Sequence, residues 1–284
     1  MKKFLETIGM LSLICFSFFY TEKIGTVVKE VDDLMVLIKS KSEEVKIEPI
    51  DAKIDRNTII PGYYGLKVDV DKSYEKMKRV GSWEENLLEY KKVLPNISLK
   101  NNYDKYVIGG NNKKNAVSFI FLVNEDSNIQ NIRKILNEKE IKGNFFIDGM
   151  WLEKNNDLVS ELIKEGHNIG NLSYNKDYSS SYFVWMDTIL KSILKQKYSF
   201  CFMEEENENY LNICALNKNY TIKPSSIITT YPMVNLKKDL SSGGIYSFAI
   251  NEYVEKELST MIQYVSSRGL NIVSLSDLLN EKEK

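Results

Sequence analysis

The sequence predicts an α/β domain over residues 115–284, preceded by a small α+β region at residues 51–114 and an N-terminal apolar helix. Strand-like and helix-like segments alternate from residue 115 onward, which is typical of a parallel sheet or barrel. Residues 51–114 hold a turn-rich segment and one predicted helix, which is too little for an independent core. An apolar run at residues 4–20 follows Lys2 and Lys3.

The apolar run predicts an uncleaved signal anchor over residues 1–22. As a helix, residues 4–20 would span about 26 Å, slightly less than the roughly 30 Å core of a bilayer. The two lysines favour a cytoplasmic N-terminus, which predicts a single-pass cell-membrane protein with an extracytoplasmic C-terminal domain. No small-residue cleavage pattern follows, because the run ends in Phe-Phe-Tyr. A cleaved signal peptide is the alternative.

Residues 23–50 predict a helix and a linker. Apolar side chains recur there at spacings of three and four, which is typical of one helix face. They are Ile24, Val27, Val31, Leu34 and Ile38. Two heptads are too few for a coiled coil, so we expect this face to pack onto the folded domain. Residues 39–50 are rich in charged side chains and predict the linker.

The region 51–114 is expected to pack against the larger domain. Residues 59–62, Ile-Ile-Pro-Gly, predict an extended piece that enters a turn. Residues 72–90 predict a helix with a break near Gly81, and residues 103–108 predict a strand.

The domain 115–284 can be divided into elements by its apolar periodicity. In chain order we expect a strand at 116–123, a helix capped by Ser127, a strand at 144–147, a helix ended by Gly166, a helix begun by residues 179–181, a helix ended by Gly269, a strand at 270–275 and a helix from Ser276. Glycine suits the left-handed position that follows a helix, which supports both predicted helix ends.

Charge and histidine content exclude two classes of function. The formal net charge is −1, so bulk electrostatics predict no binding to nucleic acid. His167 is the only histidine, whereas a catalytic zinc site usually draws on two or three imidazoles. We therefore expect no cofactor, and a capping or buried hydrogen-bonded role for His167.

The three cysteines fall into two groups. Cys15 lies in the apolar N-terminal run and is expected to be buried in the membrane. Cys201 and Cys214 flank a polar run at residues 204–209, the expected tip of a hairpin that would place them on facing strands. A disulfide, if this part is extracytoplasmic, and two buried free thiols both remain open.

One region of the α/β domain carries a specific pattern. It reads Asn144-Phe145-Phe146-Ile147-Asp148-Gly149, then Trp151-Leu152, Leu158-Val159 and Gly166-His167-Asn168-Ile169-Gly170-Asn171. In order and spacing this resembles the polysaccharide deacetylases, the NodB-homology group of carbohydrate esterases. The resemblance covers residues 115–280 and implies a distorted (β/α) barrel. It also implies an activity, because active members use a divalent metal to remove acetyl groups from cell-wall or chitin-like glycans.

The functional residues of that family are not matched. Where active members have two aspartates, a general base and a metal ligand, this sequence has Leu122 and Val123. Where they have two metal-binding histidines, it has Leu172 and Lys176, and Ala249 follows the strand that would deliver a catalytic histidine. Leucine, valine and alanine neither ligate a cation nor accept a proton, so the resemblance implies no catalytic residue and no metal site.

The mouth of such a barrel would gather polar and aromatic side chains suited to a glycan groove. The groove candidates are Asp148, Asn171, Tyr174, Asn175 and Asp177. The alternative for each is a loop residue that satisfies backbone groups. Trp151, Tyr182 and Trp185 are candidate stacking platforms for sugars, or core residues at helical spacing.

Three functions follow from these expectations. The first is a membrane-anchored, catalytically inactive deacetylase-like protein of the cell envelope that binds glycan or a protein partner. The second is an active carbohydrate deacetylase with an altered divalent-metal site, built from the carboxylates of Glu125, Asp126, Asp148 and Asp177. The third is a scaffold role carried by residues 24–110.

Overall fold

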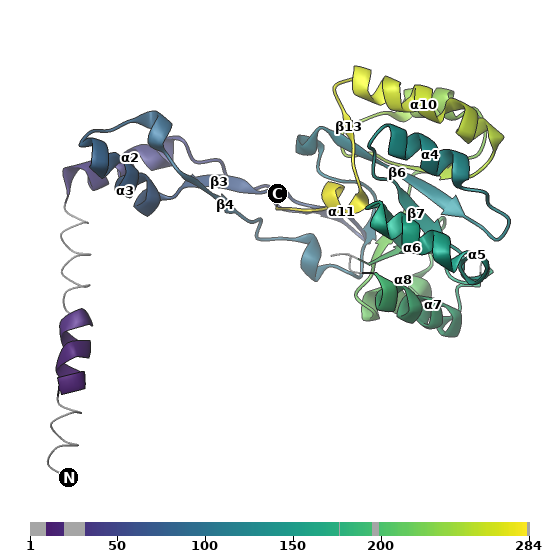
Figure 1. Ribbon diagram of the computed structural model, residues 1–284, viewed down its shortest axis with the longest axis horizontal. Coiled ribbons are helices and arrows are strands. Elements are labelled where there is room, and N and C mark those ends of the chain that lie inside the picture. Colours follow the sequence, from purple (N-terminus) through teal and green to yellow (C-terminus); the bar gives the residue numbers. More distant parts are fainter. Residues whose placement is uncertain (1–9, 20–31, 176, 195–198, 283–284) are drawn as a thin grey trace, which may run out of the picture. The chain divides into compact units, whose positions relative to one another are not determined.

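The computed structural model describes residues 10–19, 32–175, 177–194 and 199–282 (Figure 1). The chain divides into two compact units. The first comprises Met1–Pro49 and Gly65–Val93, and the second comprises Ile50–Tyr64 and Leu94–Lys284. These limits differ from the predicted ones, because residues 65–93 group with the preceding helix while the rest of 51–114 groups with the α/β domain.

The first unit is a small α+β structure. Helix α2 (Asp33–Glu44) packs with α3 (Val70–Val80), and β3 (Gly65–Val68) pairs antiparallel with β4 (Tyr90–Val93). Its buried core residues are Met35, Ile38, Val68, Tyr74 and Met77. Ile38 therefore packs as its periodicity predicts, whereas Ile24, Val27 and Val31 lie outside the described residues.

Two predictions for this unit were wrong. The linker expected from residue 39 is helical to Glu44, because α2 continues with its apolar face on α3. The helix expected over residues 72–90 ends at Val80, where Gly81 adopts a left-handed φ of 82°. A short 3-10 turn at Glu85–Leu87 and strand β4 follow instead.

Residues 10–19 form a helix whose side chains, including Cys15, are exposed. Within the described part of the chain, no helix combines the length and the apolar character needed to cross a bilayer. The predicted anchor, residues 1–22, extends beyond this helix at both ends, into residues 1–9 and 20–22, which lie outside the described residues.

The second unit is built on one largely parallel sheet. Its central strands are β6 (Ala116–Val123), β7 (Asn144–Ile147), β8 (Asn168–Asn171), β9 (Phe200–Phe202) and β10 (Tyr220–Ile222). The strand order is β1-β2-β5-β10-β9-β8-β7-β6-β12-β11, with β13 also on β6. The outer strands are β1 (Lys53–Asp55), β2 (Thr58–Ile60), β5 (Tyr106–Val107), β11 (Ile227–Ile228), β12 (Ile245–Ala249) and β13 (Asn271–Ile272).

Helices connect most of these strands. They are α4 (Gln130–Glu138), α5 (Gly149–Lys154), α6 (Asn156–Lys164), α7 (Ser180–Ile193), α8 (Glu208–Leu216), α9 (Pro232–Asp239), α10 (Glu252–Ser267) and α11 (Leu275–Leu278). The strands predicted at 116–123 and 144–147 are confirmed, but Ser127 does not cap α4. Its hydroxyl accepts a hydrogen bond from Asn124 N instead, at 2.9 Å. The last helix is capped by Ser274, so it begins earlier than predicted.

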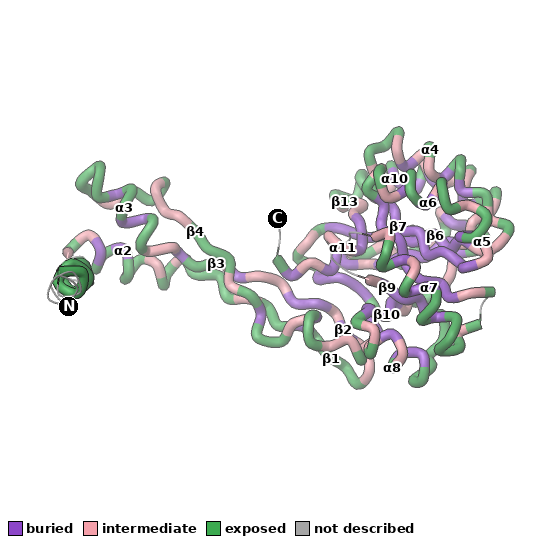
Figure 2. The backbone as a smooth tube through the Cα atoms, turned by 60° about the horizontal axis from the view of Figure 1, so that its bottom comes forward, coloured by how far each residue is buried: buried purple, intermediate pink, exposed green. Residues whose placement is uncertain are grey.

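Two apolar layers lie on the two faces of this sheet. The outer layer joins alternate strand residues such as Phe119 and Phe121 to α4, α6, α7, α9 and α10. The inner layer gathers residues from β2, β5, β6, β7, β9, β10 and β12, so the sheet must curl around it. The buried stretches of these strands are visible in Figure 2. This curled sheet with outer helices is the predicted distorted (β/α) barrel.

The N-terminal ends of the central strands are closed by α11 and a set of buried amides, which we call the frame end. Asn144 Nδ2 donates to Phe119 O at 2.8 Å, and Asn144 Oδ1 accepts from Leu275 N at 2.7 Å. Asn168 Oδ1 accepts from Ser276 N at 3.0 Å. These two asparagines of the sequence pattern thus bind the strands to α11.

Candidate functional site

The C-terminal ends of β6, β7, β8 and β12 form the opposite end of the barrel, which we call the mouth. Active sites of (β/α) barrels are built at this end, from the residues that follow the strands. The mouth of this protein holds three features. They are an apolar plug inside the barrel, an acidic cleft above it and an aromatic hollow beside the cleft.

The plug consists of Leu122, Phe146, Leu172 and Phe202, which are all buried in the inner apolar layer. Leu122 pairs in register with Phe146 on β7 and with Ala249 on β12. The rings of Phe146 and Phe202 meet edge to face at 5.5 Å. A Cβ on Gly170 would lie 2.4 Å from Cε1 of Phe146, so the neighbouring strand needs glycine there to admit this ring.

Three of the five positions that the resemblance assigns to chemistry therefore lie together at the mouth. Leu122 and Leu172 are in the plug, and Ala249 is the register neighbour of Leu122. Val123 packs in the outer layer instead, against the helices. Lys176 lies outside the described residues. The side chains described here are hydrocarbon and do not fit a divalent metal, which requires oxygen, nitrogen or thiolate ligands.

The cleft above the plug has a volume of about 350 Å³. Its lining residues are Asn124, Glu125, Asp126, Ser127, Asp148, Asn175 and Ile250. Lys154 Nζ lies 2.5 Å from Glu125 Oε1, and this hydrogen bond raises the pKa of the lysine. Among the described residues, no three histidine, cysteine or acidic side chains are grouped closely enough to hold a metal ion.

Two of the predicted groove residues are buried. Asp148 lines the cleft, and its Oδ1 accepts a hydrogen bond from Met150 N at 2.9 Å, which caps α5. Asn171 is used inside the fold, where Oδ1 accepts from Ser173 N at 2.7 Å and Nδ2 donates to Phe183 O at 3.3 Å. Asn171 is therefore a loop-fixing residue rather than a wall of the cleft.

The other three groove candidates come from the loop after β8. Asn175 lines the cleft and has a left-handed φ of 50°. Asp177 is exposed and accepts a hydrogen bond from Ser179 N at 2.7 Å, which shapes the entry to α7. Tyr174 lines the neighbouring aromatic hollow rather than the cleft. Of the candidate stacking platforms, Trp151 is buried core, whereas Tyr182 and Trp185 line this hollow.

His167 directly precedes β8, so it lies at the frame end of that strand, opposite to the mouth. Its Nδ1 accepts a hydrogen bond from Gly143 N at 3.0 Å, and its Nε2 lies 3.6 Å from Glu165 Oε2. Burial lowers the pKa of His167 to about 4, against the opposing effect of Glu165. A hydrogen bond from Arg133 lowers the pKa of Glu165 to about 2. The only histidine is thus neutral near pH 7 and serves the packing of the frame.

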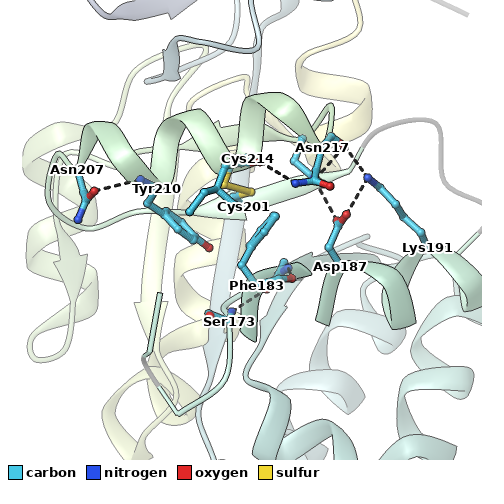
Figure 3. The surroundings of a disulfide bond; sticks show 12 residues. Ser173, Phe183, Asp187, Lys191, Cys201, Asn207, Tyr210, Cys214 and Asn217 are labelled. Carbon is cyan, nitrogen blue, oxygen red and sulfur yellow. Dashed lines mark hydrogen bonds and ion pairs between the residues drawn. A yellow bond between two sulfur atoms is a disulfide. The ribbon is translucent and has the colours of Figure 1, made fainter. Parts of the chain in front are cut away.

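Cys201 and Cys214 are joined in a buried disulfide, with their Cα atoms 6.4 Å apart (Figure 3). The bond links β9 to α8 beside the rings of Phe183 and Tyr210. The predicted hairpin is wrong, because the polar run forms the start of a helix that Asn207 caps through Tyr210 N.

Sequence reasoning missed the cleft residues Asn124 and Ile250, the plug residue Phe202, and Glu153 in the aromatic hollow. Asn124 and Ile250 directly follow β6 and β12, so the rule that barrel sites form after strands would have found them. Phe202 could have been found from the alternation of β9, where Phe200 and Phe202 face the inner layer and Cys201 between them does not. Glu153 had no signal, because an exposed helical glutamate is usually only solvated.

Comparison with known proteins agrees with this architecture. Residues 109–212 match the family model for polysaccharide deacetylase. Over 152 residues the chain is 36% identical to the uncharacterized protein YlxY of Bacillus subtilis, a match that covers 53% of this chain. The match covers 48% of YlxY, so the chain spans about half the length of that curated relative.

Solved structures show the same fold. BA3943 from Bacillus anthracis, described as a pseudoenzyme of the CE4 family, superposes with a TM-score of 0.67 at 22% identity, over 89% of this chain and 97% of that one. The peptidoglycan N-acetylglucosamine deacetylase Bc1960 superposes with a TM-score of 0.55 at 20% identity, over 63% of this chain and 95% of that one. Residues 109–212 thus match the polysaccharide deacetylase model, and the barrel described above has the fold of these solved structures.

Proposed function

We propose that this protein is a catalytically inactive member of the polysaccharide deacetylase family, and that it binds glycan of the cell envelope at the mouth of its barrel. The apolar plug is the observation that carries the proposal. Leu122 and Leu172 pack tightly with Phe146 in the position where a family active site would hold a metal and its water. Removing the general base alone costs a factor of about 10² to 10⁴ in rate, and removing the metal costs several kcal/mol more.

The cleft above the plug supports binding. It presents amide, hydroxyl and carboxylate groups from Asn124, Ser127 and Asp148, which are suitable partners for sugar hydroxyls. Similarity to proteins such as Bc1960, which acts on peptidoglycan, makes an envelope glycan the first candidate ligand. An envelope protein remains an alternative partner of the same surface.

We also propose that residues 4–20 anchor the protein in the cell membrane, with the barrel outside the cytoplasm. Lys2 and Lys3 before this apolar run support the orientation. The bond between Cys201 and Cys214 supports it independently, because disulfides persist in oxidising compartments. Mass spectrometry of the alkylated native protein should find this pair oxidised, and recovery of two free thiols would contradict the location.

The central test is an acetate-release assay combined with a binding assay. The full chain in detergent should release no acetate from peptidoglycan or N-acetylglucosamine oligomers, with or without added zinc, cobalt or nickel. It should nevertheless be retained on insoluble peptidoglycan. Metal-dependent acetate release that disappears in Asp148→Asn would establish the alternative, an active deacetylase that uses the cleft carboxylates. Lack of retention would remove the binding function.

A further inference from the structure

A second hollow lies beside the cleft, on the side of α5 and α7. Its volume is about 390 Å³, and it is lined by Glu153, Tyr174, Ser181, Tyr182 and Trp185. Tyr182 and Trp185 are 42% and 39% exposed, unlike Trp151 on the adjacent helix, which is 1% exposed. Exposed aromatic side chains gathered on one hollow are typical of a binding site, because each leaves a large apolar face in contact with water.

The three rings have a defined geometry. Tyr174 stacks on Tyr182 with centroids 5.2 Å apart and an interplanar angle of 12°. Trp185 meets Tyr174 edge to face, at 5.4 Å and 83°. The hydroxyl of Tyr174 donates to Glu153 Oε2 at 3.2 Å. The rings therefore support one another, which reduces the entropy lost when a ligand settles on them.

Gly149 makes this arrangement possible. A Cβ at that position would lie 2.4 Å from Cδ2 of Tyr174 and 3.2 Å from Cζ3 of Trp185. The N-terminus of α5 thus accommodates the tyrosine ring only because its first residue has no side chain. The hollow is therefore formed by the loop after β8 together with α5 and the first turns of α7.

The chemistry of the hollow matches a sugar ring. A pyranose presents C–H groups on its faces and hydroxyl groups around its edge, so it needs aromatic surface and hydrogen-bond acceptors together. Tyr182 and Trp185 offer the surface, while the Glu153 carboxylate and the Ser181 hydroxyl lie at the rim. A purely apolar partner would leave the carboxylate desolvated and only partly paired, which is unfavourable.

The hollow also adjoins the cleft. Asp148 lines the cleft, and Gly149 directly after it underlies Tyr174. Asn175 lines the cleft, and Tyr174 directly before it lines the hollow. Two pairs of consecutive residues therefore place the two depressions next to each other, within reach of one extended ligand.

We propose that Tyr174, Tyr182 and Trp185 form a second saccharide subsite, which holds one ring of a glycan whose neighbouring sugars occupy the cleft. This inference rests on the proposed function, since it assumes a glycan in the cleft. It adds the length of the ligand and the residues that stack on it. Affinity should rise with oligomer length until both depressions are filled.

The test uses the full chain and N-acetylglucosamine oligomers of increasing length, with affinity measured by titration calorimetry and tryptophan fluorescence. The double variant Tyr182→Ala/Trp185→Ala should weaken binding of the long oligomers by about tenfold and leave the short ones nearly unchanged. Trp185→Phe should retain most of the affinity but lose the fluorescence change. Tyr90→Ala, an exposed tyrosine of the other compact unit, serves as the matched control and should bind as the wild type does.

The outcomes separate this inference from the proposed function. If the wild type binds long oligomers and the double variant binds them equally well, the subsite is wrong and the cleft alone carries the function. If the wild type binds no oligomer of any length, both proposals fail. Circular dichroism of each variant identifies misfolding, and the single variant Tyr182→Ala then provides the comparison, because it removes one exposed aromatic face and should also weaken binding of the long oligomers selectively.

Discussion

The two ends of the barrel strands are built on different principles. At the frame end, buried amide side chains hydrogen-bond to specific backbone groups, as Asn144 does to Phe119 O and Leu275 N. At the mouth, the strands end in an apolar plug, and the polar groups line an open cleft above it. The first arrangement fixes one structure, whereas the second leaves a surface that can bind a ligand.

The same difference separates the residues that fix the fold from those that would carry chemistry. Asn144, His167 and Asn168 hold the strands to each other and to α11, so an apolar replacement leaves a buried group without its partner. The chemistry of an active site lies at the other end. There, Leu122 and Leu172 pack with Phe146 and Phe202. This close packing stabilises the barrel without a metal or a general base.

The largest effect is expected when the plug receives a charge. Leu122→Asp would place a carboxylate in the inner apolar layer, where Leu122 is 6% exposed. We expect a loss of about 3–5 kcal/mol in the free energy of unfolding, measured by urea denaturation, because an unpaired buried charge is strongly unfavourable.

Ile250→Asp is the control for that change, because Ile250 lines the open cleft and is only partly buried. Its carboxylate can remain hydrated, so its cost should be well below that of Leu122→Asp. Equal and small costs for the two variants would show that water already reaches Leu122 and that the mouth is not plugged. One mutant of the relative BA3943 is described as having restored enzymatic activity, so acetate release should be measured on both variants.

A smaller loss of stability is expected when a buried amide of the frame end is removed. Asn144→Ala leaves the carbonyl of Phe119 and the amide of Leu275 buried without these hydrogen bonds. We expect a loss of about 2–3 kcal/mol, because each orphaned buried group costs about 1 kcal/mol or more. Asn124→Ala, an asparagine of the open cleft, should change stability by less than about 0.5 kcal/mol. A reversal of this order would contradict the division between the two ends.

The frame end could largely be predicted from the sequence, and the mouth only in part. Strands such as 116–123 follow from an uninterrupted apolar run between breakers, and the family pattern supplies the barrel. Leu122 packs in the inner layer and Val123 in the outer layer. Which of the two points inward depends on how the sheet curls, and the sequence of two neighbouring apolar residues does not reveal this. A disulfide between Cys201 and Cys214 was one of two alternatives that the sequence left open, and the predicted hairpin between them is wrong because α8 begins within the polar run.

The next prediction assigns acid sensitivity to the frame end. His167 has a pKa of about 4 in the folded protein, below its ordinary value of 6.5, because it is buried. Between these values the unfolded chain binds a proton that the folded chain does not, so stability falls as pH falls from about 6.5 to 4. We expect this residue to remove about 2 kcal/mol between pH 7 and pH 5.

His167→Asn isolates that contribution, since its amide oxygen can accept the hydrogen bond from Gly143 N that Nδ1 accepts now. Because His167 is the only histidine, the variant should lose most of the stability change between pH 7 and pH 5 in urea titrations. An unchanged slope in the variant would mean that other groups cause it. Glu165 contributes only at lower pH, because its pKa of about 2 places its loss of stability below pH 4.5.

The smallest effect concerns the aromatic hollow. Gly149→Ala introduces a methyl group 2.4 Å from Cδ2 of Tyr174, so the ring must move. We expect the free energy of unfolding to fall by about 1 kcal/mol. The affinity for N-acetylglucosamine oligomers should also rise less steeply with oligomer length than it does in the wild type. The tryptophan emission should also shift, since Trp185 lies against the same position.

A double-mutant cycle decides whether the ring is the cause. In a Tyr174→Ala background the two closest ring atoms are absent, and only Cζ3 of Trp185 remains within 3.2 Å of the new methyl group. Gly149→Ala should therefore destabilise the Tyr174→Ala protein clearly less than it destabilises the wild type. If it destabilises both equally, the Tyr174 ring is not the cause, and the glycine is required by the backbone of α5. The predicted coupling ties Gly149 to the placement of Tyr174 and hence to the surface on which a sugar would stack.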